Sequence, residues 1–308
     1  MTIRRLIDAH CHLHDDRLGS PSSPSSRQRL KGVLARARVA HLSHVVSCAT
    51  HEHDWHVLQQ LMEQQRAMSD RSLVIVPAFG LHPWWALDLT SRTTDTLASL
   101  RDMLTLYPSA SVGEIGLCKS ARGQTVPLDV QVKVFQAQLQ LAVELERTCV
   151  VHCVGYYGKL LEVLLGATPQ LPPVLVLHSY SGSPDMMRSF LALRNTRVFI
   201  SLNAKQLTDP RMKKAATCCK ESPLGALLLE TDAPDQAPSV EIVEQAFTQA
   251  DEGPLVLQEG SAGVNEPALV KLALQGAAKI RGVTLDEVAA AVYRNCMDAF
   301  GLDEAKAQ

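Results

Sequence analysis

The chain has 308 residues, of which 46% are hydrophobic and 20% charged, and its formal net charge at pH 7 is −2. This composition predicts a soluble globular protein with a large core, and the small net charge excludes a general electrostatic attraction to nucleic acid or anionic membranes, though not a local basic patch. Eight cysteines without a C-x-x-C pair predict reduced thiols, and no segment has the length of a membrane span, so we expect a cytoplasmic or nuclear protein without a membrane partner.

Short apolar runs alternate with amphipathic stretches along the chain. We expect strands at residues 6–14, 44–50, 73–79, 111–117, 148–153, 173–178, 197–202 and 224–232. We expect helices at residues 29–42, 54–67, 93–106, 128–145, 158–165, 184–193 and 210–220, and mostly helical chain from residue 240 with a break at 253–267. A Ser/Pro-rich segment, about residues 19–28, is expected to form a flexible loop.

The alternation of strands and helices predicts an α/β protein with a parallel sheet. Eight expected strands fit a closed (β/α)₈ TIM barrel, here as one domain over residues 1–308 with additional C-terminal helices. An open doubly wound sheet would place a glycine-rich phosphate loop after the first strand, whereas this chain has a His-x-His pair there.

Metal-ligand side chains stand at the ends of several expected strands, where TIM barrels carry their working residues. They are His10 and His12, His82, Glu114, His152, His178 and Asp232. Each alone would as readily be a hydrogen-bonded histidine or a capping acid. Their convergence on one end of a barrel favours a metal site.

The ligand types indicate which chemistry this site would support. Four of these histidines and the two carboxylates exceed the needs of one four-coordinate ion and suit two divalent ions bridged by a carboxylate, for which Glu114 is the candidate. Asp232 could bind one ion and accept a proton from an attacking water. The pattern therefore predicts metal-assisted hydrolysis. Mixed nitrogen and oxygen ligands suit zinc or manganese, and magnesium could substitute.

The successive motifs resemble those of the TatD-like DNase family, in the same order and over nearly the whole chain. The matching segments are Asp8-Ala9-His10-Cys11-His12, Gly80-Leu81-His82-Pro83, Gly113-Glu114-Ile115-Gly116-Leu117, Val150-Val151-His152 with the helix from Gln131 to Ala142, His178-Ser179-Tyr180-Ser181-Gly182, Glu230-Thr231-Asp232-Ala233-Pro234, Asn265-Glu266-Pro267 and Tyr293-Arg294-Asn295.

The resemblance implies a metal-dependent TIM-barrel hydrolase that cuts phosphodiester bonds in DNA, in the manner of a 3'-5' exonuclease. It implies that His10 and His12 bind one metal ion with Asp232, whereas His152 and His178 bind a second ion and Glu114 bridges both. It also implies that His82 lies beside the metals and contacts the scissile phosphate or the leaving group. The expected partner is DNA that is single-stranded or frayed at its ends, and we expect a monomer.

Two positions depart from the family pattern. Cys118 stands where the family usually has an aspartate, and Cys153-Val154 follow His152 where the family often has an arginine. Both departures affect groups that could surround the metals or the phosphate. Four cations could supply phosphate contacts instead, or could be ordinary solvated charges: Lys119, Arg122, Lys159 and Lys205.

Further side chains near the expected site could contact substrate or orient a ligand. Trp84 could stack on a nucleobase, or it could pin its own loop by burial. Ser179 and Tyr180 could hydrogen-bond a phosphate. Asp8 and Glu230 share strand faces with His10 and Asp232, and each could orient a ligand or be an ordinary buried acid.

Three alternatives stay open. The same metal pair could cleave another ester or an amide, although cyclic amidohydrolases of similar architecture often have a modified lysine where this chain has Glu114. Cleavage of D-aminoacyl-tRNA esters would need the same metal chemistry. A non-catalytic interaction protein could have kept the barrel, and the loss of an acid at Cys118 is compatible with that.

Overall fold

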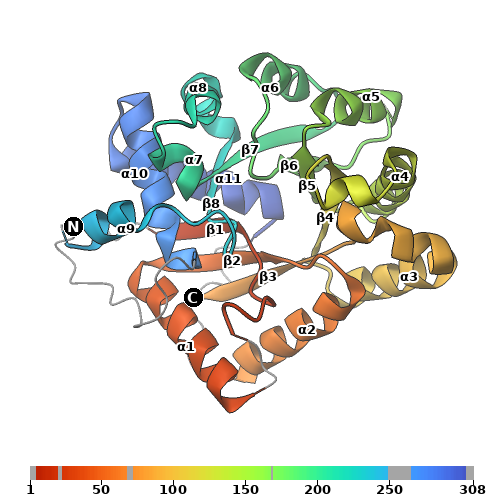
Figure 1. The fold of residues 1–308 in the computed structure, drawn as a ribbon, viewed down its shortest axis with the longest axis horizontal. Coiled ribbons are helices and arrows are strands. Elements are labelled where there is room, and N and C mark those ends of the chain that lie inside the picture. The colour runs from red at the N-terminus through yellow and green to blue at the C-terminus, as the bar shows by residue number, and fades with distance from the viewer. Residues whose placement is uncertain (1–4, 20–22, 68–71, 168, 249–264, 303–308) are drawn as a thin grey trace.

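The computed structural model describes residues 5–19, 23–67, 72–167, 169–248 and 265–302, and a ring of parallel strands lies at its centre (Figure 1). The strands are β1 (Leu6–Cys11), β2 (Leu42–Cys48), β3 (Val74–Phe79), β4 (Ser111–Cys118), β5 (Cys149–Val154), β6 (Val174–Leu177), β7 (Arg197–Asn203) and β8 (Leu227–Glu230). They form one eight-stranded sheet in the order of the sequence. The ring closes just beyond β8, where the Asp232 amide donates to the carbonyl oxygen of His10 and the His12 amide to that of Ala233. The predicted TIM barrel is confirmed.

Helices surround the barrel and connect its strands (Figure 1). They are α1 (Pro24–Val39), α2 (Glu52–Ala67), α3 (Ala86–Leu106), α4 (Leu128–Glu144), α5 (Tyr157–Ala167), α6 (Pro184–Leu191), α7 (Ala204–Thr208), α8 (Lys213–Glu221), α9 (Val240–Thr248), α10 (Val270–Arg281) and α11 (Leu285–Phe300). Short 3₁₀ turns are η1 (Pro83–Trp85), η2 (Gly123–Thr125), η3 (Leu224–Ala226) and η4 (Pro267–Leu269). In the described part of the chain, no helix combines the length and apolar character that crossing a membrane requires.

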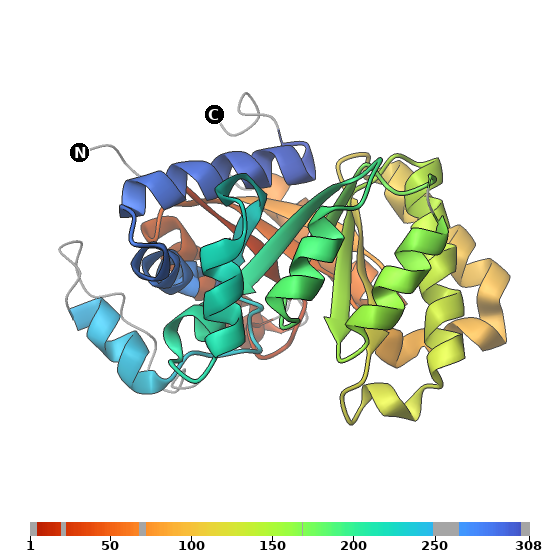
Figure 2. The same ribbon diagram turned by 90° about the horizontal axis from the view of Figure 1, so that it is seen from above.

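The two ends of the barrel differ in chemistry. Figure 2 shows α11 lying across the end at which the strands begin. Inward-facing side chains of the strands pack there against α11 in a second apolar cluster, which includes Ile7, Val76, Val150, Val176, Phe199, Leu228, Cys296, Met297 and Phe300. This end is closed and apolar, so the polar side chains of the barrel interior gather at the opposite end, where the strands finish.

Several helix boundaries differ from the sequence prediction. Helix α1 begins at Pro24, inside the segment expected to be a loop, because the Ser23 side chain caps it by accepting from the Ser26 amide and proline suits the first turn. Residues 20–22 of that segment lie outside the described residues. Helix α3 begins at Ala86, well before the expected start at residue 93, and α7 was not expected. A capping box between Asn203 and Gln206 begins α7.

Two buried glutamines on α4 fasten the loops at the open end of the barrel. Gln131 accepts from the Cys118 amide and donates to the carbonyl oxygens of Cys118, Gly123 and Val126. Gln138 accepts from the Leu81 amide and donates to its carbonyl oxygen. These amides replace sheet hydrogen bonds where β3 and β4 end, and thereby fix the main chain on either side of the strand ends.

Gln131→Met is expected to lower the free energy of unfolding by at least about 2 kcal/mol, because buried main-chain groups lose their hydrogen-bond partner. Urea denaturation measures this change. Gln140→Met, on an exposed position of the same helix, is the matched control and is expected to change the value by less than about 0.5 kcal/mol. Equal stabilities of the two variants would contradict a structural role for the Gln131 amide.

Candidate metal centre

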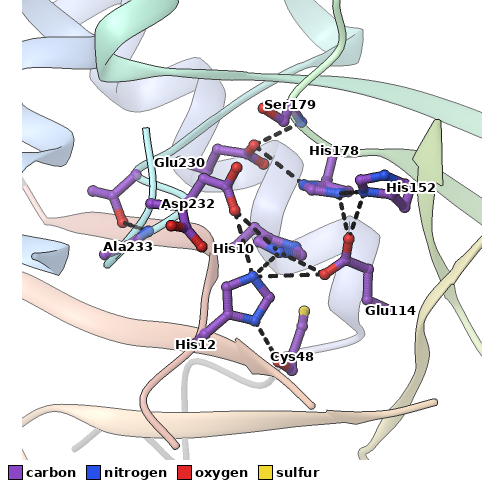
Figure 3. Close-up of polar contacts among 12 residues, drawn as sticks. His10, His12, Cys48, Glu114, His152, His178, Ser179, Glu230, Asp232 and Ala233 are labelled. Carbon is purple, nitrogen blue, oxygen red and sulfur yellow. Dashed lines mark hydrogen bonds and ion pairs between the residues drawn. The ribbon is translucent and has the colours of Figure 1, made fainter. Parts of the chain in front are cut away.

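Side chains from five strands meet inside the open end of the barrel (Figure 3). His10, Glu114 and His152 lie within β1, β4 and β5, and His12, His178 and Asp232 lie just beyond β1, β6 and β8. Close packing of strands allows this convergence. A Cβ atom on Gly116, whose φ is +145°, would lie 1.9 Å from the carbonyl oxygen of His152, so only glycine lets β4 approach β5 here.

The buried carboxylate of Glu114 is the centre of the cluster. Its Oε2 atom lies 3.4 Å from Nε2 of His10 and 3.6 Å from Nε2 of His12. Its Oε1 atom lies 2.7 Å from Nδ1 of His152 and 2.9 Å from Nε2 of His178. The two oxygens of one carboxylate therefore face two different pairs of imidazoles.

Asp232 adds a second carboxylate to the His10 side of the cluster. Its Oδ1 atom lies 3.4 Å from Nε2 of His12 and 3.7 Å from Nε2 of His10. The residue has φ of +59°, a left-handed conformation that aspartate tolerates better than most residues. This turn places the carboxylate over the strand ends directly after β8.

Hydrogen bonding fixes which nitrogen of His12 faces the cluster. Its Nδ1 lies 2.7 Å from the carbonyl oxygen of Cys48, which can only accept, so Nδ1 carries the proton of the neutral ring. The Nε2 lone pair of His12 then faces the oxygens of Glu114 and Asp232 and lies 3.3 Å from Nε2 of His10. A proton or a cation between these buried acceptors would relieve their repulsion, so the group suits a cation site.

The pKa directions agree with this need for positive charge. Burial alone would lower the pKa of His12, but Asp232 and Glu114 raise it to about 9. Burial alone would raise the pKa of Glu114, but His178, His82 and the other imidazoles hold it well below its usual value. A cation bound by His10, His12 and Glu114, whose ligand atoms lie within 4.8 Å of one another, would supply the same compensation.

The His178 side of the cluster is braced by Glu230. Oε1 of Glu230 accepts from the Ser179 amide at 2.6 Å and lies 3.6 Å from Nδ1 of His178, while Oε2 accepts from the Ser201 hydroxyl. The ring of His178 stacks on that of His10 with centroids 3.9 Å apart. Glu230 therefore holds the imidazole of His178 in place, as carboxylates behind metal-binding histidines do.

His82 faces the same carboxylate with a different hydrogen-bonding role. Its Nδ1 accepts from the Trp84 amide at 3.1 Å, so the proton of the neutral ring lies on Nε2, which is 3.4 Å from Oε1 of Glu114. Burial and neighbouring His152 lower its pKa well below the usual value, which keeps the ring neutral. His82 thus presents an N–H donor to the cluster rather than a lone pair.

Cys118, at the position of the departure from the family pattern, lies beside His152. Burial alone would raise the pKa of its thiol, but interactions with His152 and Ser120 lower it to about 7. Its Sγ lies 3.1 Å from Oγ of Ser120. The thiol contacts the imidazole of His152. The sequence alone did not show which residue it would contact.

The expected substrate-contact residues lie in different surroundings. Trp84 is half-buried with its ring centroid 4.2 Å from that of His82. Oγ of Ser179 accepts from the Asn203 side chain at 2.8 Å. Lys205 lies on α7, where it adds to the effect of Arg211 in lowering the pKa of Asp209 to about 2.

Tyr180 does not fit the expected substrate contact. Its side chain is 1% exposed, and its hydroxyl donates to the carbonyl oxygen of Ser183 at 2.9 Å. Its ring packs against Tyr157 and Phe190. The residue follows His178 in the sequence but points into the layer between α5 and α6, because the chain turns at Ser179, whose φ is +45°.

The carboxylate of Asp8 hydrogen-bonds to Thr231 rather than to a histidine ring. This carboxylate accepts from the amide of Thr231 at 2.9 Å and from the hydroxyl of Thr231 at 2.6 Å. It joins β1 to the segment after β8 and so supports the turn that carries Asp232. Nδ1 of His10 has no protein partner among the described residues.

Comparisons with known proteins agree over nearly the whole chain. A family model described as TatD related DNase matches residues 7–301. Deoxyribonuclease TATDN3 from Homo sapiens is 24% identical over 304 residues, which cover 96% of this chain and 94% of that protein. The 3'-5' ssDNA/RNA exonuclease TatD from Erwinia amylovora is 28% identical over 273 residues, which cover 88% of this chain and 93% of that protein. The crystal structure of YJJV, a TatD homolog from Escherichia coli, has a TM-score of 0.73 at 25% identity and covers 98% of this chain and 100% of that one.

Divalent metal is expected to raise the thermal unfolding midpoint of EDTA-treated protein, because binding to the native cluster adds about 2.7 kcal/mol at about 100 times the dissociation constant. Differential scanning fluorimetry with Zn²⁺, Mn²⁺ or Mg²⁺ measures this shift. Glu114→Gln is expected to lose most of it, whereas Glu144→Gln, on the exposed surface, keeps it. A wild-type midpoint that none of the metals changes would argue against a metal site.

Proposed function

Because this chain belongs to the TatD related DNase family, we propose that it is a divalent-metal-dependent nuclease that hydrolyses phosphodiester bonds of DNA. The family match confirms the family that the sequence motifs predict, and with it the class of metal-dependent hydrolases. The observation that carries the proposal is the placement of Glu114. Each of its oxygens faces a separate pair of buried histidines, as a carboxylate shared between two cation sites would.

Within this proposal the ligands divide into two sets that share Glu114. His10, His12 and Asp232 form one set, and His152 and His178 form the other. Zinc, manganese or magnesium are the candidate ions, since the donors are imidazole nitrogens and carboxylate oxygens. When bound, two such ions polarise a phosphoryl group and make water a stronger nucleophile.

The side chains of the protein supply the remaining chemistry. The carboxylate of Asp232 lies at the edge of the cluster with Oδ1 beside His12, where it can accept the proton that an attacking water loses. The Nε2–H of His82 can donate to a phosphate oxygen or to the leaving group. The Ser179 hydroxyl, which accepts from Asn203, keeps its own proton for a phosphate oxygen.

The proposed substrate is single-stranded DNA or a frayed end, cut from the 3' side. Support comes from the Erwinia amylovora relative, whose name describes a 3'-5' ssDNA/RNA exonuclease, and from the human deoxyribonuclease. Lys205 stands on the same face of the barrel, at the end of β7, and is a candidate contact for a more distant phosphate. Eight free, buried cysteines support a reducing cytoplasmic or nuclear location, and a monomer remains our expectation.

End-labelled single-stranded DNA is expected to be shortened by the wild-type protein in the presence of Mg²⁺, Mn²⁺ or Zn²⁺ but not after chelation. Glu114→Ala is expected to lower kcat by at least about 10³, because the bridging carboxylate supports both cation sites. Glu144→Ala is the control. Gel analysis with the label at the 5' or the 3' end shows the direction in which the strand is shortened. Metal-loaded protein that cuts no nucleic acid but cleaves a D-aminoacyl ester would replace the nuclease with an esterase, and protein without metal or activity would favour an interaction role.

Metal analysis of the purified protein is expected to find about two ions per chain. His178→Ala is expected to reduce the metal content to about one ion per chain. His12→Ala, which changes the ligand set on the other side of Glu114, is expected to have the same effect. Inductively coupled plasma mass spectrometry after gel filtration gives the content. One ion in the wild-type protein, lost in both variants, would mean that Glu114 does not bridge.

A further inference from the structure

Arg122 lies over two indole rings beside the metal centre. Its guanidinium carbon Cζ is 4.3 Å from the ring centroid of Trp84 and 4.7 Å from that of Trp85. Trp84 follows β3 and Arg122 follows β4, so two neighbouring loops at the open end of the barrel contribute. We refer to Arg122, Trp84 and Trp85 as the Arg–Trp platform.

The platform adjoins the cluster on the side of His152. The ring of Trp84 lies 4.2 Å from that of His82 and 6.5 Å from that of His152, measured between centroids. The guanidinium of Arg122 is one further contact away, on the Trp84 ring, and the residue is exposed. Trp84 therefore contacts both the guanidinium and a histidine of the cluster, so an anion held by Arg122 would lie beside the cluster rather than within it.

Hydrogen bonds hold the platform in a fixed geometry. Oγ of Ser120 accepts from the Gly123 amide at 3.1 Å and from Nε1 of Trp84 at 3.4 Å, which ties the two loops together. Gln131 holds the carbonyl oxygen of Gly123 from below. An arginine that is ordered before binding loses little conformational entropy when it meets an anion.

The described residues do not neutralise the charge of Arg122. Among the described residues no carboxylate lies within ion-pair distance of its guanidinium. Arg197, at the other end of the barrel, also lies over a ring, with Cζ 4.6 Å from the centroid of Phe199, but its Nη1 is 3.1 Å from a carboxylate oxygen of Asp298. The contrast shows that stacking in this protein does not by itself occupy the N–H groups of an arginine, which remain available for a phosphate.

The other candidate cations near the site are engaged differently. The ammonium of Lys159 pairs with Glu162 at 2.6 Å, and that of Lys119 lies over the ring of Tyr156 at 5.8 Å. Since Arg122 covers the ring of Trp84, a nucleobase could stack on that face only by displacing the guanidinium. The arrangement favours recognition of an anion over recognition of a base.

We propose that the Arg–Trp platform binds the phosphate next to the scissile one on a nucleic-acid strand. Arg122 is thereby a specificity-determining residue that favours oligonucleotides over esters with a single phosphate. This inference rests on the proposed nuclease function. Cys153 and Val154 follow His152 where the family often has an arginine. Arg122 would supply a cation to the site instead.

The test compares two substrates of the metal-loaded full chain: a short single-stranded oligothymidylate and bis(p-nitrophenyl) phosphate, which has no second phosphate. Arg122→Gln is expected to lower the ratio of kcat/KM for the oligonucleotide to kcat/KM for the small ester about tenfold, mainly through KM for the oligonucleotide. Arg197→Gln removes a stacked arginine and one charge at the opposite end of the barrel, and is expected to leave this ratio within twofold, that is, within about 0.4 kcal/mol.

The salt dependence gives an independent readout. A plot of log kcat/KM for the oligonucleotide against log salt concentration is expected to be less steep by about 0.7 in Arg122→Gln, the value for one lost phosphate contact on a single strand. Circular dichroism checks that the variant is folded.

The outcomes separate the two proposals. Wild-type protein that cleaves neither substrate with any metal would overturn the nuclease function itself. Wild-type protein that cleaves both, with an unchanged ratio and salt slope in Arg122→Gln, would overturn only the role of the platform. A ratio that falls in Trp84→Leu but not in Arg122→Gln would mean that the indole contacts the strand directly, which would also overturn the phosphate assignment.

Discussion

A carboxylate buried among imidazoles is the constraint on which this structure depends. Glu114 is 2% exposed and lies within 3.6 Å of nitrogens on five histidines. A carboxylate that has lost its hydration is tolerated only where positive charge or hydrogen-bond donors replace the water. The strands place the histidines, and a hydrogen bond at the second ring nitrogen also orients His12 and His82. The protein therefore presents a site whose charge is balanced only when protons or cations occupy it.

The barrel separates this demanding site from the part that stabilises the fold. At the closed end, apolar side chains of the strands pack against Cys296, Met297 and Phe300 of α11. At the open end, buried amides and carboxylates fasten the main chain, with Gln131 and Gln138 holding the loops after β3 and β4, and Asp8 the turn after β8. Gln131, Gln138 and Asp8 thus help to position the segments that carry the residues of the candidate cation site.

The sequence predicted the barrel and the residues that gather at its open end because both follow from local rules. Strand alternation places His10 and His12 on one face, and the ends of parallel strands meet at one end of a barrel. The features that the sequence alone did not predict depend on contacts between distant segments. The burial of Tyr180 follows from the left-handed turn at Ser179, and the donor role of His82 follows from its hydrogen bond with the Trp84 amide. The early start of α1 was available locally, in the Ser23 cap and Pro24, and was outweighed by the composition of the surrounding segment.

The residues proposed for the reaction and those proposed for substrate selectivity come from different parts of the barrel, the strand ends and the loops. The candidate cation ligands come from strand ends, whose geometry the barrel fixes. Arg122, Trp84 and Trp85 come from the loops after β3 and β4, which the barrel constrains less and Ser120 joins to each other. A change in those loops alters which anion is held beside the cluster without moving a ligand. Cys118 lies beside His152 on one side and Ser120 on the other. The position at which this chain departs from the family pattern therefore contacts both a candidate ligand and the residue that joins the two loops.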